Sequence, residues 1–141
     1  LLRPHYLCRM RLPGSAGDGV RDVGRVPDVT PLLLLADALI TDHSSIMFDY
    51  ALLDRPLILH VPDAAALGGG YFDLAEHAPG PVTRTEDDLL AALADLDRVD
   101  AEYAGRRRDF VRRFGEYDRG TAARAVVERF FTTVREGVRD G

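Results

Sequence analysis

Two adjacent serines, preceded by an aspartate and a histidine, are the residues of this sequence best suited to chemistry. They lie in the stretch "LITDHSSIMFDY", residues 39–50, between two apolar segments. The order Asp42, His43, Ser44 contains the residue types of a hydrolase triad. A triad brings together residues from distant loops, however, whereas consecutive side chains diverge. The serines also lack the G-x-S-x-G pattern of a nucleophile elbow, so we reject a nucleophilic serine.

The same residues fit a phosphate site better. We expect a helix to begin at Ser44 or Ser45, and the first N–H groups of a helix have no partner within it. These groups carry a partial positive charge, and two small hydroxyl side chains add donors without adding bulk. A phosphate or diphosphate would therefore be accommodated there. The alternative is that Ser44 only caps the helix, and the two roles are compatible.

Other candidate groups are more isolated. His5 follows an expected strand end and is placed to donate to an anion, although a lone histidine is more often structural. The loop "GGGYFD", residues 68–73, either closes over a ligand or merely connects two elements. No pair of Cys or His has metal-ligand spacing, so no metal site is predicted. Asp42 and Asp49 still leave room for a loosely held Mg²⁺.

The elements that must position these residues alternate between short apolar strands and helices. Residues 38–41 and 56–61 are expected to be strands, and the second is apolar throughout, as in a parallel sheet covered on both faces. Residues 20–24 are expected to form another short strand, and residues 63–81 are expected to form an irregular segment. Five helices are expected. The first begins after Asp28 or Thr30 with Pro31 in its first turn, and the second runs from Ser44 or Ser45 to about Leu53.

The third expected helix follows a Thr85 cap and carries Leu89, Leu93 and Leu96 on one stripe. The fourth begins near Asp100 with Tyr103, Phe110 and Phe114 on one face, and the fifth begins near Thr121.

This order predicts an α/β fold: a Rossmann-like, doubly wound parallel sheet with flanking helices. Ligands of such sheets bind beyond the carboxyl ends of the strands, where loops lead into helices. Residues 41–45 occupy one such place.

Composition narrows the class of partner. The 141 residues fit one domain, residues 1–141, and 46% of them are hydrophobic, which is typical of a globular protein. The net charge is -5 with an acidic middle and no aromatic-basic interleaving, which argues against a nucleic-acid partner. The chain has arginine but no lysine. One expected helix carries five arginines, which form either a patch that docks on an anionic surface or a solvated face: Arg106, Arg107, Arg108, Arg112 and Arg113. Because "LLRPHYLCRM" begins in mid-pattern, we expect a domain of a longer chain.

Four segments in order resemble the CDP-glycerol glycerophosphotransferase family, the enzymes that polymerise teichoic acids. "LLRPHY" resembles the family's R-x-H strand end, and residues 28–63 contain "TDHSS", similar to its T-D-Y-S-S joint. "YFDLAEHAPGPVTRTEDDLL" resembles its F-Y-F-D…P-G-P segment, and "RFGEYDRGTAARAVVERFF" its closing helix. The resemblance is to the C-terminal part of the family and covers nearly the whole chain.

The resemblance implies the donor-binding half of a GT-B fold. It implies that Ser44 and Ser45 contact the phosphates of the donor, that Thr41 and Asp42 shape the joint, and that His5 acts catalytically at those phosphates. Two positions depart from the family pattern. His43 replaces a tyrosine, and Gly68 stands where an arginine is expected near the phosphates. Loss of a bidentate phosphate contact would weaken donor binding, because charge-assisted hydrogen bonds are the strong ones.

The activity implied is phosphoryl transfer from CDP-glycerol, the donor substrate, to a hydroxyl of a membrane-linked, teichoic-acid-like polymer, with release of CMP. No further cofactor is implied. The expected location is cytoplasmic, peripheral on the inner face of the cell membrane, with an anionic membrane surface as a further partner. Two alternatives stay open: a GT-B glycosyltransferase that uses a nucleotide sugar, and a catalytically silent nucleotide-binding module.

Overall fold

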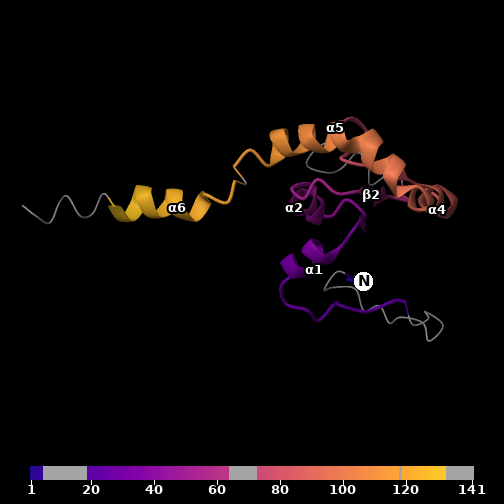
Figure 1. The fold of residues 1–141 in the computed structure, drawn as a ribbon, viewed down its shortest axis with the longest axis horizontal. Helices are drawn as coiled ribbons and strands as arrows, with labels where there is room; N and C mark the ends of the chain where they lie inside the picture. Colours follow the sequence, from indigo (N-terminus) through magenta and orange to yellow (C-terminus); the bar gives the residue numbers. More distant parts are fainter. Residues whose placement is uncertain (5–18, 64–72, 118, 133–141) are drawn as a thin grey trace, which may run out of the picture. The chain divides into compact units, whose positions relative to one another are not determined.

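The computed structural model describes residues 1–4, 19–63, 73–117 and 119–132 (Figure 1). Two compact units divide the chain, Leu1–Ala36 and Asp37–Gly141. In the first unit, Leu2 and Asp22 form an isolated parallel bridge, with Leu2 N–H donating to the Arg21 carbonyl at 2.8 Å. The predicted strand 20–24 is thus reduced to a single bridging residue.

The helix of the first unit is α1, Thr30–Leu35, with Pro31 in its first turn as predicted. The Asp28 carboxylate accepts a hydrogen bond from Thr30 N–H at 2.9 Å, whereas Thr30 itself lies inside the helix. Hydrogen bonds from the backbone and side chain of Thr30 hold the pKa of Asp28 below its ordinary value. Asp28 is therefore the residue that satisfies this helix end.

The second unit contains a parallel sheet of three strands in the order β1-β2-β3: β1 (Leu39–Thr41), β2 (Leu57–His60) and β3 (Val82–Thr83). Leu39 pairs with Leu57, and Leu59 pairs with Val82. The apolar side chains of the central strand β2 are fully buried, as its continuous hydrophobicity predicted. The predicted fold class, α/β with a parallel sheet and flanking helices, is confirmed in this unit.

The helices of the second unit differ from the expected ones mainly at their ends. They are α2 (Ile46–Ala51), α3 (Leu74–His77), α4 (Glu86–Ala94), α5 (Leu96–Phe114) and α6 (Ala122–Val127), the last followed by a π-helical turn, Glu128–Thr132. Helix α5 begins earlier than predicted because the Asp95 carboxylate accepts the N–H of Arg98 at 3.2 Å and ends the preceding helix there. Two elements were not predicted. Helix α3 lies inside the segment 63–81 that was predicted to be irregular, and strand β3 follows it directly.

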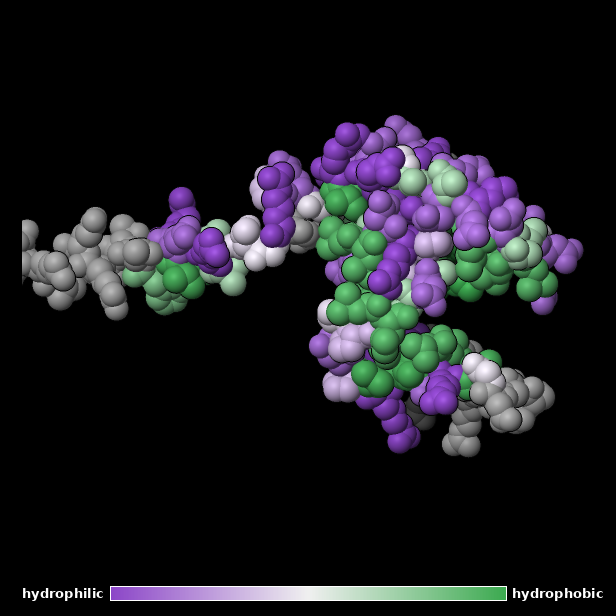
Figure 2. Space-filling model, in the orientation of Figure 1, coloured by the Kyte–Doolittle hydropathy of each residue, from purple (hydrophilic) through white to green (hydrophobic). Residues whose placement is uncertain are grey.

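Helix α5 packs against α2 and α4 (Figure 1). It covers two apolar clusters. In the first, Ile58, Ala92 and Val99 are buried, and the predicted stripe of Leu89, Leu93 and Leu96 packs against them, together with Tyr103. The second is aromatic, with ring centroids 5.1 Å apart for Phe48 and Phe110 and 4.8 Å apart for Phe110 and Phe114. Figure 2 shows mainly hydrophilic side chains over α5 on the opposite, outer side.

Helix α4 starts at the Thr85 cap that the sequence predicted, and the structure shows that this cap is a capping box. The Thr85 hydroxyl accepts the N–H of Asp88 at 3.1 Å, and the Asp88 carboxylate accepts the N–H of Thr85 at 3.3 Å. These hydrogen bonds hold the pKa of Asp88 below its ordinary value of 3.8. Two N–H groups at the helix end thereby gain partners.

Replacing Thr85 with Ala is expected to lower the free energy of unfolding by about 1 kcal/mol at neutral pH, because the cap is lost. A carboxyl whose pKa is lowered by folding stabilises above its unfolded pKa, and this contribution disappears as the pH falls through the lowered value. The penalty of Thr85→Ala should therefore shrink below about pH 3.8, the ordinary value for Asp88. Urea titrations at pH 7 and pH 3 measure this, and an equal penalty at both pH values would contradict it.

Candidate functional site

The joint between β1 and α2 is a tight turn held by its own polar groups. Strand β1 ends at Thr41, and the Asp42 carboxylate then accepts the N–H of Ser44 at 2.8 Å. The Ser44 hydroxyl accepts the N–H of Ile46 at 3.5 Å, the outer limit of a hydrogen bond. Ser44 therefore caps the helix weakly at best, and its oxygen keeps the capacity for another partner.

The two serines differ in exposure. Ser45 occupies the N-cap position of α2, is exposed, and makes no capping hydrogen bond with its side chain. Ser44 is half-buried, whereas Asp42 and His43 are exposed. Two hydroxyl groups and an imidazole thus lie next to one another in sequence at the carboxyl end of a parallel strand, which is where ligands of such sheets bind.

The backbone contributes less to this joint than the sequence indicated. Helix α2 has six residues, and the N–H groups of Met47 and Phe48 already donate to the carbonyls of Ser44 and Ser45, at 3.2 and 3.0 Å. The Asp42 carboxylate also adds a negative charge at the turn. A phosphate bound here would depend on the serine hydroxyls and on a cation from another segment, because two anionic groups in proximity repel.

A second polar pair, which the sequence analysis missed, lies at the same edge of the sheet. His60 ends β2, and its Nδ1 lies 3.1 Å from the hydroxyl of Thr83, which ends β3. The Thr83 hydroxyl donates to the Leu59 carbonyl at 3.4 Å, so its oxygen is left to accept from Nδ1–H of His60. This arrangement leaves Nε2 of the half-buried ring for an external partner. The signal in the sequence was a histidine at the end of a predicted strand.

Two predicted features cannot be placed in this arrangement, and a third lies away from the joint. His5 and the Gly68 position both fall outside the residues that the structure describes. Asp49 is described and exposed on α2, one turn beyond the joint. Within the described ranges, no three or more His, Cys, Asp or Glu side chains come together in a way that could hold a metal ion.

One of the five arginines predicted to lie on the surface of α5 is buried, so that prediction is wrong for Arg107. Arg107 is 1% exposed, and its guanidinium donates to Asp54 at 3.0 Å and to Asp100 at 2.6 Å. It is a buried structural residue that ties α5 to the turn after α2. The periodicity of the helix explains this, because Arg107 lies between Tyr103 and Phe110 on the inward face.

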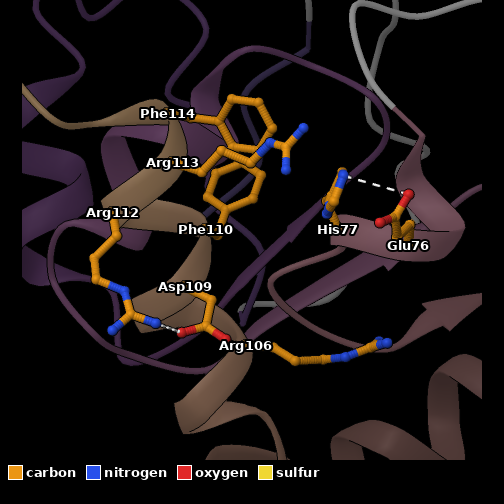
Figure 3. Close-up of a pocket in the computed structure, with 8 residues that line it drawn as sticks. All are labelled: Glu76, His77, Arg106, Asp109, Phe110, Arg112, Arg113 and Phe114. Carbon is orange, nitrogen blue, oxygen red and sulfur yellow. Dashed lines mark hydrogen bonds and ion pairs between the residues drawn. The ribbon is translucent and has the colours of Figure 1, made fainter.

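The other arginines of α5 are exposed, and three of them line a cavity of about 470 Å³ beside α3 (Figure 3). The cavity is lined by Glu76, His77, Arg106, Asp109, Phe110, Arg112, Arg113 and Phe114. Arg112 pairs with Asp109, and His77 lies 3.5 Å from the carboxylate of Glu76. This is a concave, partly aromatic and partly basic surface.

A comparison with protein families decides where this chain belongs. The model of the CDP-glycerol:poly(glycerophosphate) glycerophosphotransferase family matches residues 1–132. The chain belongs to this family. The match includes the joint at Ser44 and Ser45 and every element of the sheet.

Individual members of the glycerophosphotransferase family show the same relationship. The chain is 36% identical over 135 residues to the teichoic acid glycerol-phosphate transferase of Staphylococcus aureus, covering 93% of this chain and 34% of that protein. It is 32% identical over 136 residues to the teichoic acid poly(glycerol phosphate) polymerase of Bacillus subtilis, covering 93% of this chain and 18% of the polymerase. The chain therefore spans about a third or less of the length of these relatives.

Solved structures of a family member confirm the fold. The wall teichoic acid polymerase TagF, a GT-B-type enzyme, superposes with a TM-score of 0.71 and 33% identity, over 84% of this chain and 30% of that one. A TagF variant soaked with CDPG also matches with a TM-score of 0.71, at 32% identity over 84% of this chain and 31% of that one. No helix in the described part of this chain is long and apolar enough to cross a membrane.

Proposed function

We propose that this chain is the donor-binding part of an enzyme that transfers glycerol phosphate from CDP-glycerol to a hydroxyl of a teichoic-acid-like polymer. The family match over residues 1–132 carries the proposal, because it includes the whole described sheet and the polar joint at its carboxyl edge. A relative of the same fold was soaked with CDPG, which supports a cytidine nucleotide as donor. The proposal treats residues 1–141 as one nucleotide-binding domain of a longer two-domain protein.

The donor polyol is glycerol in this proposal. The glycerol-phosphate transferase and polymerases are 31–36% identical to this chain, whereas the ribitol-phosphate polymerases are 30% and 26% identical. A GT-B glycosyltransferase that uses a nucleotide sugar is not favoured, because the named relatives act on glycerol or ribitol phosphate.

In the proposed reaction, a hydroxyl oxygen of the acceptor attacks the phosphorus that bears glycerol. The bond from that phosphorus to the bridging oxygen of CDP breaks, and CMP leaves with the electron pair. Ser44 and Ser45 bind the donor phosphates with their hydroxyls, with His43 beside them and Thr41 and Asp42 fixing the turn. His5 is assigned to the leaving phosphate, where a proton or a hydrogen bond neutralises the developing charge. The base that accepts the hydroxyl proton is not assigned to this chain.

We place this activity on the cytoplasmic side of the cell membrane, peripheral to it. A nucleotide-activated donor and a membrane-linked polymer would meet there. The chain itself would supply donor binding, and transfer would require the remainder of the protein, since the named relatives are about three times as long or more.

Replacing both serines with alanine, Ser44→Ala/Ser45→Ala, is expected to weaken binding of CDP-glycerol and CDP at least tenfold. The reason is that each hydrogen bond to a charged phosphate contributes about 1.5–3 kcal/mol. Calorimetric titration with CDP-glycerol, CDP, CMP and UDP-glucose measures this. Thr121→Ala is the matched control, because Thr121 is another exposed N-cap hydroxyl without a capping hydrogen bond.

The ligand series separates the alternatives. Tighter binding of UDP-glucose than of CDP-glycerol would contradict the proposal in favour of a glycosyltransferase. Equal affinity in the wild type and the double variant would remove the serines from the site. Binding of CDP-glycerol by the full-length protein without release of CMP in the presence of acceptor would indicate a silent nucleotide-binding module.

A further inference from the structure

Two arginines of α5 differ from its other arginines in their charge partners. Arg112 pairs with Asp109, and Arg108 lies 3.9 Å from Asp54. Within the described ranges, Arg106 and Arg113 are in no ion pair. Their guanidiniums instead lie over aromatic rings, 5.9 Å from the centroid of Tyr103 and 5.6 Å from that of Phe114.

Both of these arginines line the cavity between α3 and α5 (Figure 3). Figure 3 shows Arg106 and Arg113 extending from α5 toward the side on which His77 lies, whereas Arg112 points away from it. The His77 ring stands edge-on to Phe114, with the centroids 6.0 Å apart. Two guanidinium groups without a carboxylate partner in the described ranges therefore line one hollow, at separate places along α5.

The cavity suits an anion attached to a short carbon chain. Its volume of about 470 Å³ lies in the range that small-molecule sites occupy. The lining residues include three arginines and two carboxylates, a local excess of one positive charge in a chain with net charge -5. A guanidinium binds a phosphate through two parallel N–H groups, and the Phe110 and Phe114 rings offer apolar contact to carbon atoms beside it.

The cavity is also linked to the joint that holds the two serines. Phe48 lies on α2, three residues after Ser45, and its ring packs 5.1 Å from Phe110 and 5.7 Å from Phe114. Three residues of helix rise about 4.5 Å, so the serines and the rings lie about one turn apart along α2. A polymer whose end reacts at the joint would have earlier phosphates near this helix.

We infer that the cavity between α3 and α5 binds phosphodiester groups of the glycerol phosphate polymer, with Arg106 and Arg113 as their ligands. The identity of the polymer rests on the proposed function. A flat membrane surface fits these arginines less well. Contact with a membrane would need charges spread over a convex face, whereas Arg106 and Arg113 line a hollow and Arg107 is buried. Binding here holds the acceptor chain while its terminal hydroxyl reaches the donor.

The test is titration of the chain with a short synthetic oligomer of glycerol phosphate. Arg106→Gln/Arg113→Gln is expected to weaken binding about tenfold or more, because charge-assisted hydrogen bonds to a phosphate are lost. The control is Arg108→Gln/Arg124→Gln, which removes the same charge from exposed residues outside the cavity and should leave binding within about twofold. Arg106→Lys/Arg113→Lys should restore part of the affinity, since it keeps the charge but loses the bidentate geometry. Circular dichroism confirms that each variant is folded.

Three results would overturn the inference. Equal weakening in the two glutamine double variants would show nonspecific attraction of a polyanion. Loss of binding to phosphatidylglycerol vesicles without loss of oligomer binding would assign the arginines to a membrane surface. Loss of CDP-glycerol binding would assign the cavity to the donor.

Titration of the same variants with CDP-glycerol separates this inference from the proposed function. If the oligomer binds through Arg106 and Arg113 but CDP-glycerol does not bind the wild type, the donor assignment fails and the cavity stands. If CDP-glycerol binds through the serines but the oligomer does not bind, the cavity assignment alone fails.

Discussion

Gly80→Ala is expected to disrupt the pairing of β2 with β3 and to lower the free energy of unfolding of the second unit by about 3 kcal/mol or more. A Cβ atom at residue 80 would lie 1.7 Å from the carbonyl oxygen of Leu57 and 2.7 Å from its carbonyl carbon. These are backbone atoms of the central strand, so no side chain can rotate to make room. Overpacking in a core costs about 1–3 kcal/mol even where side chains can adjust, and a domain is stable by only about 5–15 kcal/mol.

The position of Gly80 explains why the neighbouring residues cannot move away. Ala78, Pro79 and Gly80 are buried, and the Pro81 carbonyl accepts the N–H of Leu59 at 2.9 Å. A shift of this segment would break the first contact of β3 with β2. Moving β2 would disturb the fully buried side chains of Leu57 and Ile58.

Urea denaturation followed by circular dichroism measures the effect of Gly80→Ala. Gly105→Ala is a matched control, because a Cβ atom there meets nothing within 4 Å and the residue lies inside α5. Alanine is the better helix former, so this variant should be more stable by about 0.5–1 kcal/mol. An unchanged midpoint for Gly80→Ala would show that the backbone at residue 80 is not held against β2.

Arg107→Ala is expected to lower the free energy of unfolding by about 2–5 kcal/mol, whereas Arg107→Met should cost no more than about 1 kcal/mol. Alanine leaves a cavity where a fully buried side chain packed between α5 and the turn after α2. Methionine fills most of that volume without a charge to desolvate. The carboxylates of Asp54 and Asp100 are 50% and 47% exposed, so water can solvate them when the guanidinium is gone.

The Nη1 atom of Arg107 is a further reason to expect a smaller stability loss for Arg107→Met than for Arg107→Ala. Its Nη1 is buried and has no hydrogen-bond partner among the residues described. A buried donor without a partner costs about 1–3 kcal/mol, which offsets part of the gain from the two carboxylates. An apolar side chain of similar size removes that cost.

Thermal and urea denaturation of both variants measure the difference, with Arg108→Ala as the control. Arg108 is exposed, and its guanidinium lies 3.9 Å from Asp54, a distance at which surface pairs contribute little. Its removal should change the free energy of unfolding by less than about 0.5 kcal/mol. Equal costs for Arg107→Ala and Arg107→Met would show that the charge, and not the volume, stabilises this position.

Local patterns in the sequence determined most of the secondary structure correctly. The apolar run of β2, the Thr85 cap of α4 and the leucine stripe that follows it were all predicted, because each depends on residues close together in the chain. The strand-to-helix joint at Ser44 and Ser45 and the family also follow from short segments in order. Neighbouring residues alone set helix caps and hydrophobic periods, so these features need no tertiary structure.

The tertiary structure decided which polar residues are structural and which are free. Arg107 was predicted to lie in a surface patch, but its partners Asp54 and Asp100 come from other positions in the chain, and a buried ion pair of this kind leaves no local pattern. His60 meets Thr83 through the pairing of β2 with β3, and Arg106 and Arg113 line a cavity because α3 packs beside α5. Apart from Asp100, which lies seven residues before Arg107 on α5 itself, the partners in these contacts come from different elements. The sequence lists the charged groups, but only the packed chain determines which of them find an opposite charge.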